Sequence, residues 1–151
     1  MEISADQVKA LRDKTGMSMM LVRKALVEAD GNEARALEVL GRMGEEISEK
    51  KATREINAGV IDAYIHHNKQ VGVMMKVKTE TDFVANNPEF QQAIHQIAMH
   101  IAAMGTESVE VLLAEPIMTD PTKTVKEIIS GLTSKFGERV EIDSFTRMSL
   151  S

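Results

Sequence analysis

The spacing of apolar residues changes twice along this chain. Between residues 22 and 29 they recur at the three- and four-residue intervals of one helix face. Between residues 71 and 78 they alternate with other residues, which is the period of a strand. After residue 87 the helical spacing returns. A chain that changes period in this way contains both helices and strands, and grouped strands favour an α+β fold.

Residues 1–44 predict three short helices, because each apolar segment is bracketed by capping signals. Ser4 and Gln7 form a capping box at the first helix. Gly16 follows that helix, as glycine commonly does at helix C-termini. The third helix is expected to end before Gly41 and Gly44. We interpret residues 1–44 as a small three-helix domain.

The next segment, residues 45–57, is mostly charged and predicts a solvated helical linker. Residues 60–66 and 71–78 then predict two strands. The four residues between them, 67–70, are polar and too few for any connection but a hairpin. A core domain of residues 58–151 therefore begins with an antiparallel pair.

Two further helices are expected in this core. Asn87 with Pro88, and Asp120 with the proline after it, each resemble a helix cap followed by proline at the first helical position. Residues 139–148 predict a last strand. The core should be a three-stranded antiparallel sheet packed by two helices on one face.

Charge and composition exclude several classes of function. The net charge is −5, which argues against direct nucleic-acid binding because phosphates attract a basic surface. The chain has no cysteine, so no disulfide and no Cys-ligated metal site can form. No apolar run approaches the ~20 residues that cross a bilayer, and the first residues are unlike a signal peptide. We expect a soluble cytoplasmic protein without a membrane partner.

No catalytic constellation is apparent. The chain lacks a glycine-rich phosphate loop, a nucleophile elbow and a zinc-protease motif. His66 and His67 are adjacent, and His95 and His100 are five residues apart, so neither pair suits a shared metal. We expect no catalytic residues, no metal and no cofactor.

One surface segment, residues 79–87, contains Phe83 between Asp82 and Val84. It joins a strand to a capped helix, which places it on the surface. Two interpretations follow from the pattern. Phe83 packs under the following helix as part of the core, or Asp82 and Phe83 project together into a partner. The pattern alone favours the first.

Several segments closely resemble the translation elongation factor Ts family, in the family's order and nearly at its spacing. They are Leu11–Gly16, Met19–Met20, Lys24–Leu26, Ala63–Asn68, Val71–Val73, Glu80–Ala85 and Ala98–Ala102. The stretch from Asp120 to Glu138 is also similar to the family's final helix and the start of its last strand. The resemblance extends over almost the whole chain.

The resemblance implies a guanine-nucleotide exchange factor for elongation factor Tu, in its GDP-bound and nucleotide-free states. It also implies that the first three helices are of the ubiquitin-associated (UBA) type. The segment that displaces magnesium from the GTPase would be Thr81, Asp82, Phe83 and Val84. The N-terminal contact surface would comprise Arg12, Met19, Met20 and Arg23. Such a factor makes and breaks no bonds, so it is not an enzyme.

The chain also departs from the family's pattern. Leu21 replaces an acidic residue, and Asn86 replaces an arginine. Residues 104–122 form only a short bridge where relatives carry extra helical sequence. An alternative function is therefore an adaptor that binds elongation factor Tu without exchange activity.

The sheet suggests a second kind of partner. Residues 60–66 are apolar on both faces of their strand, although a sheet with helices on one side is normally polar on the other. We expect this face to be covered in a homodimer. The elongation GTPase and the N-terminal bundle are the competing occupants.

Overall fold

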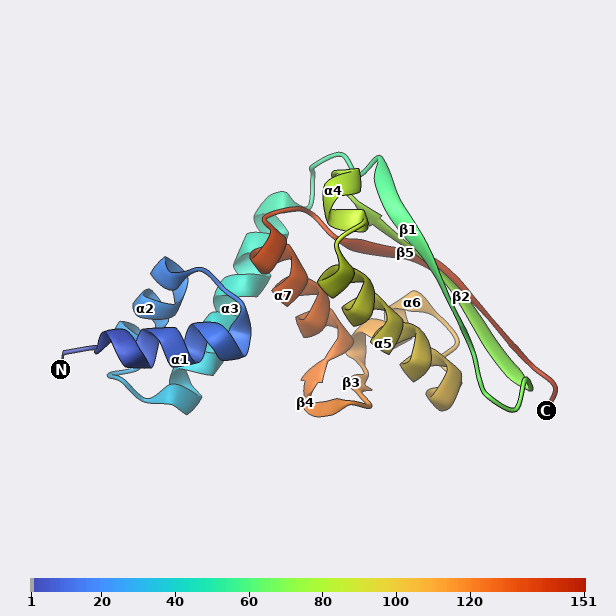
Figure 1. The fold of residues 1–151 in the computed structure, drawn as a ribbon, viewed down its shortest axis with the longest axis horizontal. Coiled ribbons are helices and arrows are strands. Elements are labelled where there is room, and N and C mark those ends of the chain that lie inside the picture. Colours follow the sequence, from blue (N-terminus) through green and yellow to red (C-terminus); the bar gives the residue numbers. More distant parts are fainter. Residues whose placement is uncertain (1) are drawn as a thin grey trace.

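The computed structural model describes residues 2–151, and its helical bundle and its sheet lie toward opposite ends of an elongated molecule (Figure 1). In chain order the elements are α1 (Ala5–Thr15), α2 (Met19–Glu28), α3 (Glu33–Lys51), β1 (Ala58–Ile65), β2 (Val71–Thr79), α4 (Asp82–Ala85), α5 (Pro88–Met104), α6 (Val109–Ala114), β3 (Pro116–Ile117), β4 (Asp120–Thr124), α7 (Val125–Phe136) and β5 (Glu141–Ser149).

The helix starts of the N-terminal bundle follow the sequence signals. Ser4 and Gln7 form both hydrogen bonds of the predicted capping box. Gly16 ends α1 with a left-handed φ of 68°, a conformation that glycine adopts without steric penalty. Asn32 caps α3 by accepting from the Arg35 N–H. The predictions for Ser4, Gln7 and Gly16 are confirmed.

The predicted end of the third helix is wrong, because α3 continues through Gly41 and Gly44 to Lys51. Gly44 lies against α7, where an added Cβ would be 3.3 Å from the Ser134 hydroxyl oxygen. At the end of α3, the Lys51 ammonium group donates to the Gly137 carbonyl at 2.8 Å. Close packing between the two helices thus outweighs the ~1 kcal/mol helix penalty of glycine.

The predicted three-stranded antiparallel sheet is confirmed, with the order β1–β2–β5. Residues 66–70 connect β1 to β2 as a hairpin, and the last strand pairs with β2. An irregularity in the β2–β5 register lies between Lys76 and Val77, and it leaves Asp143 as an extra residue on β5. Alternating burial along β1 separates a helix-covered face from an open face.

Helices cover one face of this sheet (Figure 1). α5 packs on β1 and β2, and α6 packs on β5. α7 joins the same core through Val125 and Leu132, and it also packs on α3. The core therefore contains two short helices, α4 and α6, beside the two expected ones.

The predicted helix start at Asp120 is wrong. Asp120 begins strand β4, which pairs with β3, and α7 begins five residues later with Thr124 as its cap. The Asp120 carboxylate accepts from the N–H and the hydroxyl of Thr122, at 3.2 and 2.6 Å. That local turn uses the side chain that would otherwise cap a helix.

Buried apolar residues form two separate clusters. One joins residues 8–43 of the bundle, and the other joins residues 73–142 of the core. The division at residues 44 and 57 into domain, linker and domain stays a prediction, as does the UBA-like character of the bundle. Among residues 2–151, every helix is too short or too polar to cross a membrane.

Candidate partner-binding sites

The segment after β2 forms α4, a single helical turn that exposes Phe83. The ring is 86% exposed, the highest exposure among the large apolar side chains of residues 2–151. Its neighbours Val84 and Ala85 are buried in the core. The interpretation of Phe83 as a core residue is therefore wrong. A surface aromatic on an anchored turn is typical of a protein contact.

The side of α4 that carries Phe83 borders a shallow hollow. The hollow is lined by Asp82, Phe83, Asn86, Asn87 and Pro88. Asp82 and Phe83 of α4 thus line the same hollow, just before α5 begins, and their joint contact with a partner stays a prediction. Thr81 lies before this exposed pair as the helix cap, and Val84 lies behind it in the core.

Two glutamates hold the start of α4, and the sequence analysis assigned neither of them to the site. Glu138 accepts from Thr81, and Glu80 accepts from the backbone N–H of Arg139 at 2.7 Å. The signal for Glu138 was present, because Gly137 with Glu138 belonged to a segment that resembles the family. Its contact with residue 81 depends on the fold.

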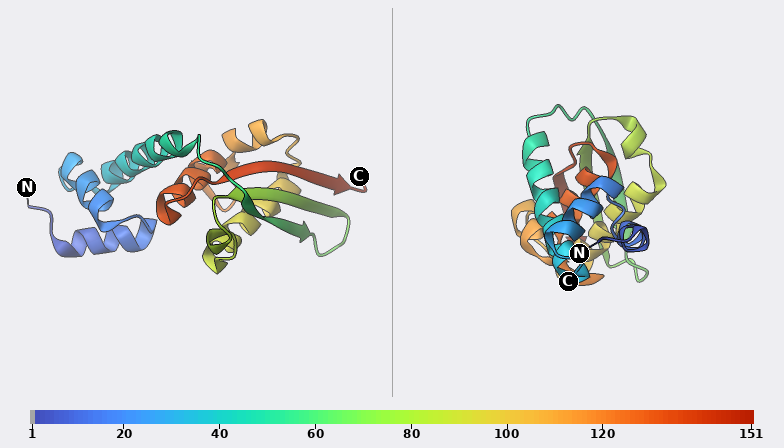
Figure 2. Two further views of the ribbon diagram at one scale, coloured as in Figure 1. Left: turned by 90° about the horizontal axis from the view of Figure 1, so that it is seen from above. Right: turned by 90° about the vertical axis from the view of Figure 1, so that its left-hand side faces the viewer.

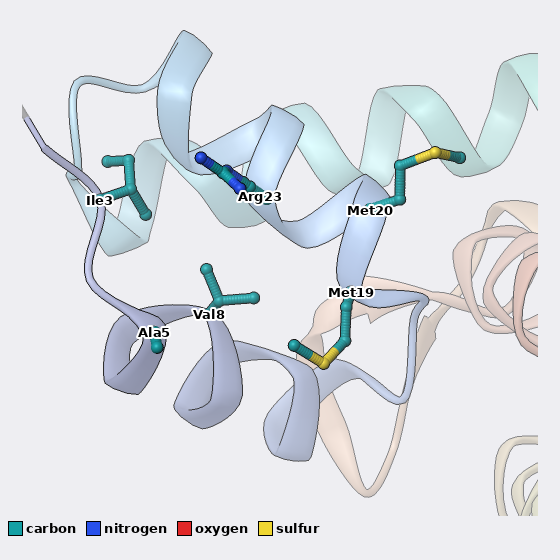
Figure 3. Close-up of a pocket in the computed structure, with 6 residues that line it drawn as sticks. All are labelled: Ile3, Ala5, Val8, Met19, Met20 and Arg23. Carbon is teal, nitrogen blue, oxygen red and sulfur yellow. The ribbon is translucent and has the colours of Figure 1, made fainter.

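The N-terminal bundle carries a second hollow between α1 and α2 (Figure 3). Ile3, Ala5, Val8, Met19, Met20 and Arg23 line it. Figure 3 shows Val8 and Met19 facing the space between the helices, whereas Met20 points away from α1. Met20 is 77% exposed.

Three of the four residues proposed for the N-terminal contact therefore share one surface. Arg12 is exposed on α1 but does not line the hollow. Ile3 and Ala5 line it but were not among the predicted contact residues. Their place in the hollow depends on how the start of α1 packs beside α2, since Ile3 precedes α1 and Ala5 is its first residue.

Helix α1, which borders the N-terminal hollow, and the turn α4 lie toward the same side of the molecule. In both views of Figure 2, α1 and α4 lie toward the same edge, with α3 and α7 connecting the parts that carry them. Lys135 of α7 lies over Gly16 at the end of α1, within 3.1 Å of where a Cβ would be.

Three of the four histidines, His66, His95 and His100, hydrogen-bond other groups of the protein. His66 and His67 follow the last residue of β1, and their ring centroids are 4.2 Å apart. His66 hydrogen-bonds Tyr64, and His95 hydrogen-bonds Asp62 at 2.8 Å. No group of three metal-binding side chains occurs within residues 2–151.

The open face of the sheet is mostly apolar toward the β1–β2 hairpin and charged toward the other end, and Ile61 lies opposite Lys76 where the two regions meet. Ile61, Ile65, Met74 and Met148 are all exposed on strands that pair with one another. At the other end, Lys76 and Lys78 lie 3.7 and 3.5 Å from Asp143.

The charged end also affects the pKa of Asp143. Desolvation opposes ionisation of Asp143, but a hydrogen bond from Ser144 and the charges of Lys78 and Lys76 together lower its pKa. Asp143 therefore stays ionised and offsets part of the positive charge on this face.

Comparison with known proteins agrees with these features. The family model described as Elongation factor TS matches residues 80–151, which include α4 and the whole of α7 and β5. Elongation factor Ts of Pseudothermotoga lettingae is 39% identical over 155 residues, covering 93% of this chain and 78% of the relative. That of Thermosipho melanesiensis is 42% identical over 151 residues, with 90% and 77% covered.

A third relative reveals a difference in length. Elongation factor Ts of Fervidobacterium nodosum is 32% identical over 195 residues and is matched over 99% of both chains. Because this chain has 151 residues, that relative contains internal segments that the chain lacks. The chain belongs to the elongation factor Ts family and thereby to the elongation factors of translation.

Proposed function

We propose that this protein is a guanine-nucleotide exchange factor that releases GDP from elongation factor Tu in the cytoplasm. The observation that carries the proposal is the exposure of Phe83 on a turn whose neighbours are buried. We call Asp82 and Phe83 the wedge. A wedge must be exposed to reach its partner, and its backbone must be anchored so that it can displace groups of the partner. The family membership supports the identity of the partner.

The proposed mechanism is displacement without bond chemistry. GDP is held by a phosphate-binding loop and a Mg²⁺ ion that offsets its charge. Asp82 and Phe83 would enter beside that site, with Thr81 and Val84 fixing their base. Moving the groups around Mg²⁺ removes a large electrostatic contribution to GDP affinity. Because binding free energies are reciprocal, GDP weakens the factor as much as the factor weakens GDP.

The N-terminal bundle would supply the affinity that offsets this loss. Met19, Met20 and Arg23 border one apolar hollow, and Arg12 is exposed on α1, the helix that lies toward the same edge as α4. Methionine adapts its shape to a partner surface, and arginine is common at binding hot spots. We infer that this UBA-like surface binds the GTPase while α4 acts at its nucleotide site.

Stopped-flow release of fluorescent GDP from elongation factor Tu tests the proposal. Substoichiometric amounts of this protein should accelerate release over many turnovers. Binding without acceleration would exclude exchange and establish the adaptor function instead. No binding at all would exclude both.

Magnesium dependence tests the mechanism separately from the function. Chelating Mg²⁺ already removes the interaction that the factor is proposed to disturb. The ratio of catalysed to uncatalysed release should therefore fall toward one in chelator. An undiminished ratio would show that the factor acts on another part of the GTPase.

We further propose a homodimer through the open face of the sheet. The apolar patch formed by Ile61, Ile65, Met74 and Met148 is exposed in the single chain. Two-fold pairing would bury the patch on both copies and close the assembly. The charged end with Lys76 and Asp143 would lie at its margin.

A further inference from the structure

We propose that Glu138 is a positioning residue for exchange, acting through Thr81 to hold the turn that carries Phe83. This inference rests on the proposed exchange function. Glu138 contacts Thr81 and does not line the hollow beside Phe83, so it need not touch the partner. Its effect is on the orientation of α4, which consists of only four residues.

The carboxylate of Glu138 binds both donors of Thr81. One oxygen accepts from the Thr81 N–H at 2.9 Å, and the other accepts from its hydroxyl at 2.6 Å. The two-point contact fixes the backbone and the side chain of Thr81 together. Hydrogen bonds to an ionised acceptor are shorter and stronger than neutral ones.

Thr81 in turn begins α4. Its hydroxyl oxygen accepts from the Val84 N–H at 3.4 Å, which is the N-cap hydrogen bond. That distance is long, so the cap depends on the orientation of the hydroxyl. Donating its proton to Glu138 leaves the Thr81 oxygen free to accept from Val84. The glutamate thus selects the rotamer in which the cap forms.

A reciprocal contact makes this orientation more rigid. Glu80 accepts from the backbone N–H of Arg139, while Glu138 accepts from the backbone N–H of Thr81. Two consecutive residues of one segment are thereby joined to two consecutive residues of the other. Arg54 adds an ion pair to Glu80 at 3.5 Å.

The need for such support follows from the length of α4. An isolated helical turn is unstable because nucleation fixes several residues for one hydrogen bond. Val84 and Ala85 anchor the turn from below. Asp82 and Phe83 have no covering side chains, so their direction is set by how the turn begins at Thr81.

Glu138→Ala tests the inference, with Glu141→Ala as the matched control. Glu141 is a neighbouring carboxylate whose ionic partner is the Arg139 side chain, and no hydrogen bond joins it to α4. The charge change is the same in both variants. Glu138→Gln keeps one acceptor oxygen and should give an intermediate result.

The first measurement is the maximal rate of GDP release at saturating factor. We expect about a tenfold decrease for Glu138→Ala, with the half-saturating concentration changed less than about twofold, because charged hydrogen bonds have roughly this effect. Glu141→Ala should leave both unchanged. A purely structural loss would instead lower the thermal midpoint and the affinity together.

The second measurement uses Phe83→Ala as a background. If Glu138 acts through the wedge, adding Glu138→Ala to Phe83→Ala should cause little further loss. A further tenfold loss in that background would overturn the inference. An unchanged rate for the single Glu138→Ala variant would overturn it as well.

Amide hydrogen exchange provides a readout that does not depend on nucleotide-exchange activity. The amides of Ala85, Asn86 and Asn87 donate within or just after α4. In the Glu138→Ala protein they should exchange about tenfold faster, with unchanged protection in α5. Unchanged protection of these three amides would overturn the inference. If the wild-type protein failed to accelerate GDP release, the proposed function would fall, and this measurement would still decide whether Glu138 holds α4 in position.

Discussion

Replacing Phe83 by alanine should abolish most exchange activity without destabilising the protein. A side chain that is 86% exposed contributes little to folding, so the free energy of unfolding should change by less than about 0.5 kcal/mol. In the complex the same ring could bury about 150 Å². At roughly 25 cal/mol per Å², its contribution to the complex is at most about 4 kcal/mol.

The matched variant for stability is Phe90→Ala. Phe90 is fully buried and meets Phe136 edge to face, with ring centroids 6.0 Å apart. Truncating it should cost about 3–5 kcal/mol. The thermal midpoint should then fall by about 10 °C. Phe83→Ala should melt within a degree or two of the wild type.

Stopped-flow GDP release and thermal melts on both variants decide the matter. A loss of about 2–4 kcal/mol in the activation of release corresponds to roughly 30- to 1,000-fold. Asp82→Ala should also slow release more than it affects the melt. Normal release by Phe83→Ala, with a normal melt, would refute the assignment of the wedge. A melt lowered as far as that of Phe90→Ala would refute the exposed position.

Four other positions give shorter tests. Gly59→Ala should lower the thermal midpoint, because the added Cβ would lie 2.4 Å from a carbonyl oxygen of β2. Gly41→Ala should instead raise the free energy of unfolding by about 0.5–1 kcal/mol, because Gly41 lies inside a helix with open space around it. If the thermal midpoints of the two glycine variants shifted equally and in the same direction, this expectation would be contradicted. Hydrogen bonds from the Thr122 hydroxyl and then from its N–H lower the pKa of Asp120 below its ordinary value of 3.8. The ionised Asp120 side chain therefore contributes to the free energy of unfolding above pH 3.8, and this contribution is lost as the pH falls through the lowered pKa. The stability difference between wild type and Asp120→Ala should therefore shrink below that pH in melts across an acid series. Met74→Glu should convert the proposed homodimer to monomer by light scattering, and a wild-type protein that stays monomeric at high micromolar concentration would refute the dimer.

Most of the correct fold predictions came from local sequence signals. The capping box at Ser4 and the alternation of residues 71–78 depend on near neighbours, and both led to the correct element. The errors arose where distant packing decided the outcome. Gly44 looked like a helix end because its contact with Ser134 on α7 cannot be recognised from the local sequence. Asp120 looked like a cap because the pairing of β3 with β4 was not anticipated.

The candidate site was predictable in part for the same reason. The pattern around Phe83 indicated a surface segment but favoured the core for the ring, and only the resemblance to a family pointed outward. Burial of Val84 and Ala85 explains the outcome, since they occupy the core positions of the turn. The hydrogen bonds from Thr81 to Glu138 join residues 57 positions apart. A contact between residues so far apart in the chain cannot be recognised from the local sequence.

The geometry of α4 reconciles two requirements that usually conflict. A wedge must present a large apolar surface to solvent, yet a mobile aromatic loses conformational entropy on binding and so binds less strongly. Here Val84 and Ala85 fix the turn from the core, while Thr81 and Glu138 fix its beginning. The ring of Phe83 therefore gains rigidity from residues that the partner need not contact. If the proposed function holds, the GTPase would meet a preformed surface, and binding free energy would be available for the proposed displacement of Mg²⁺ rather than for ordering the factor.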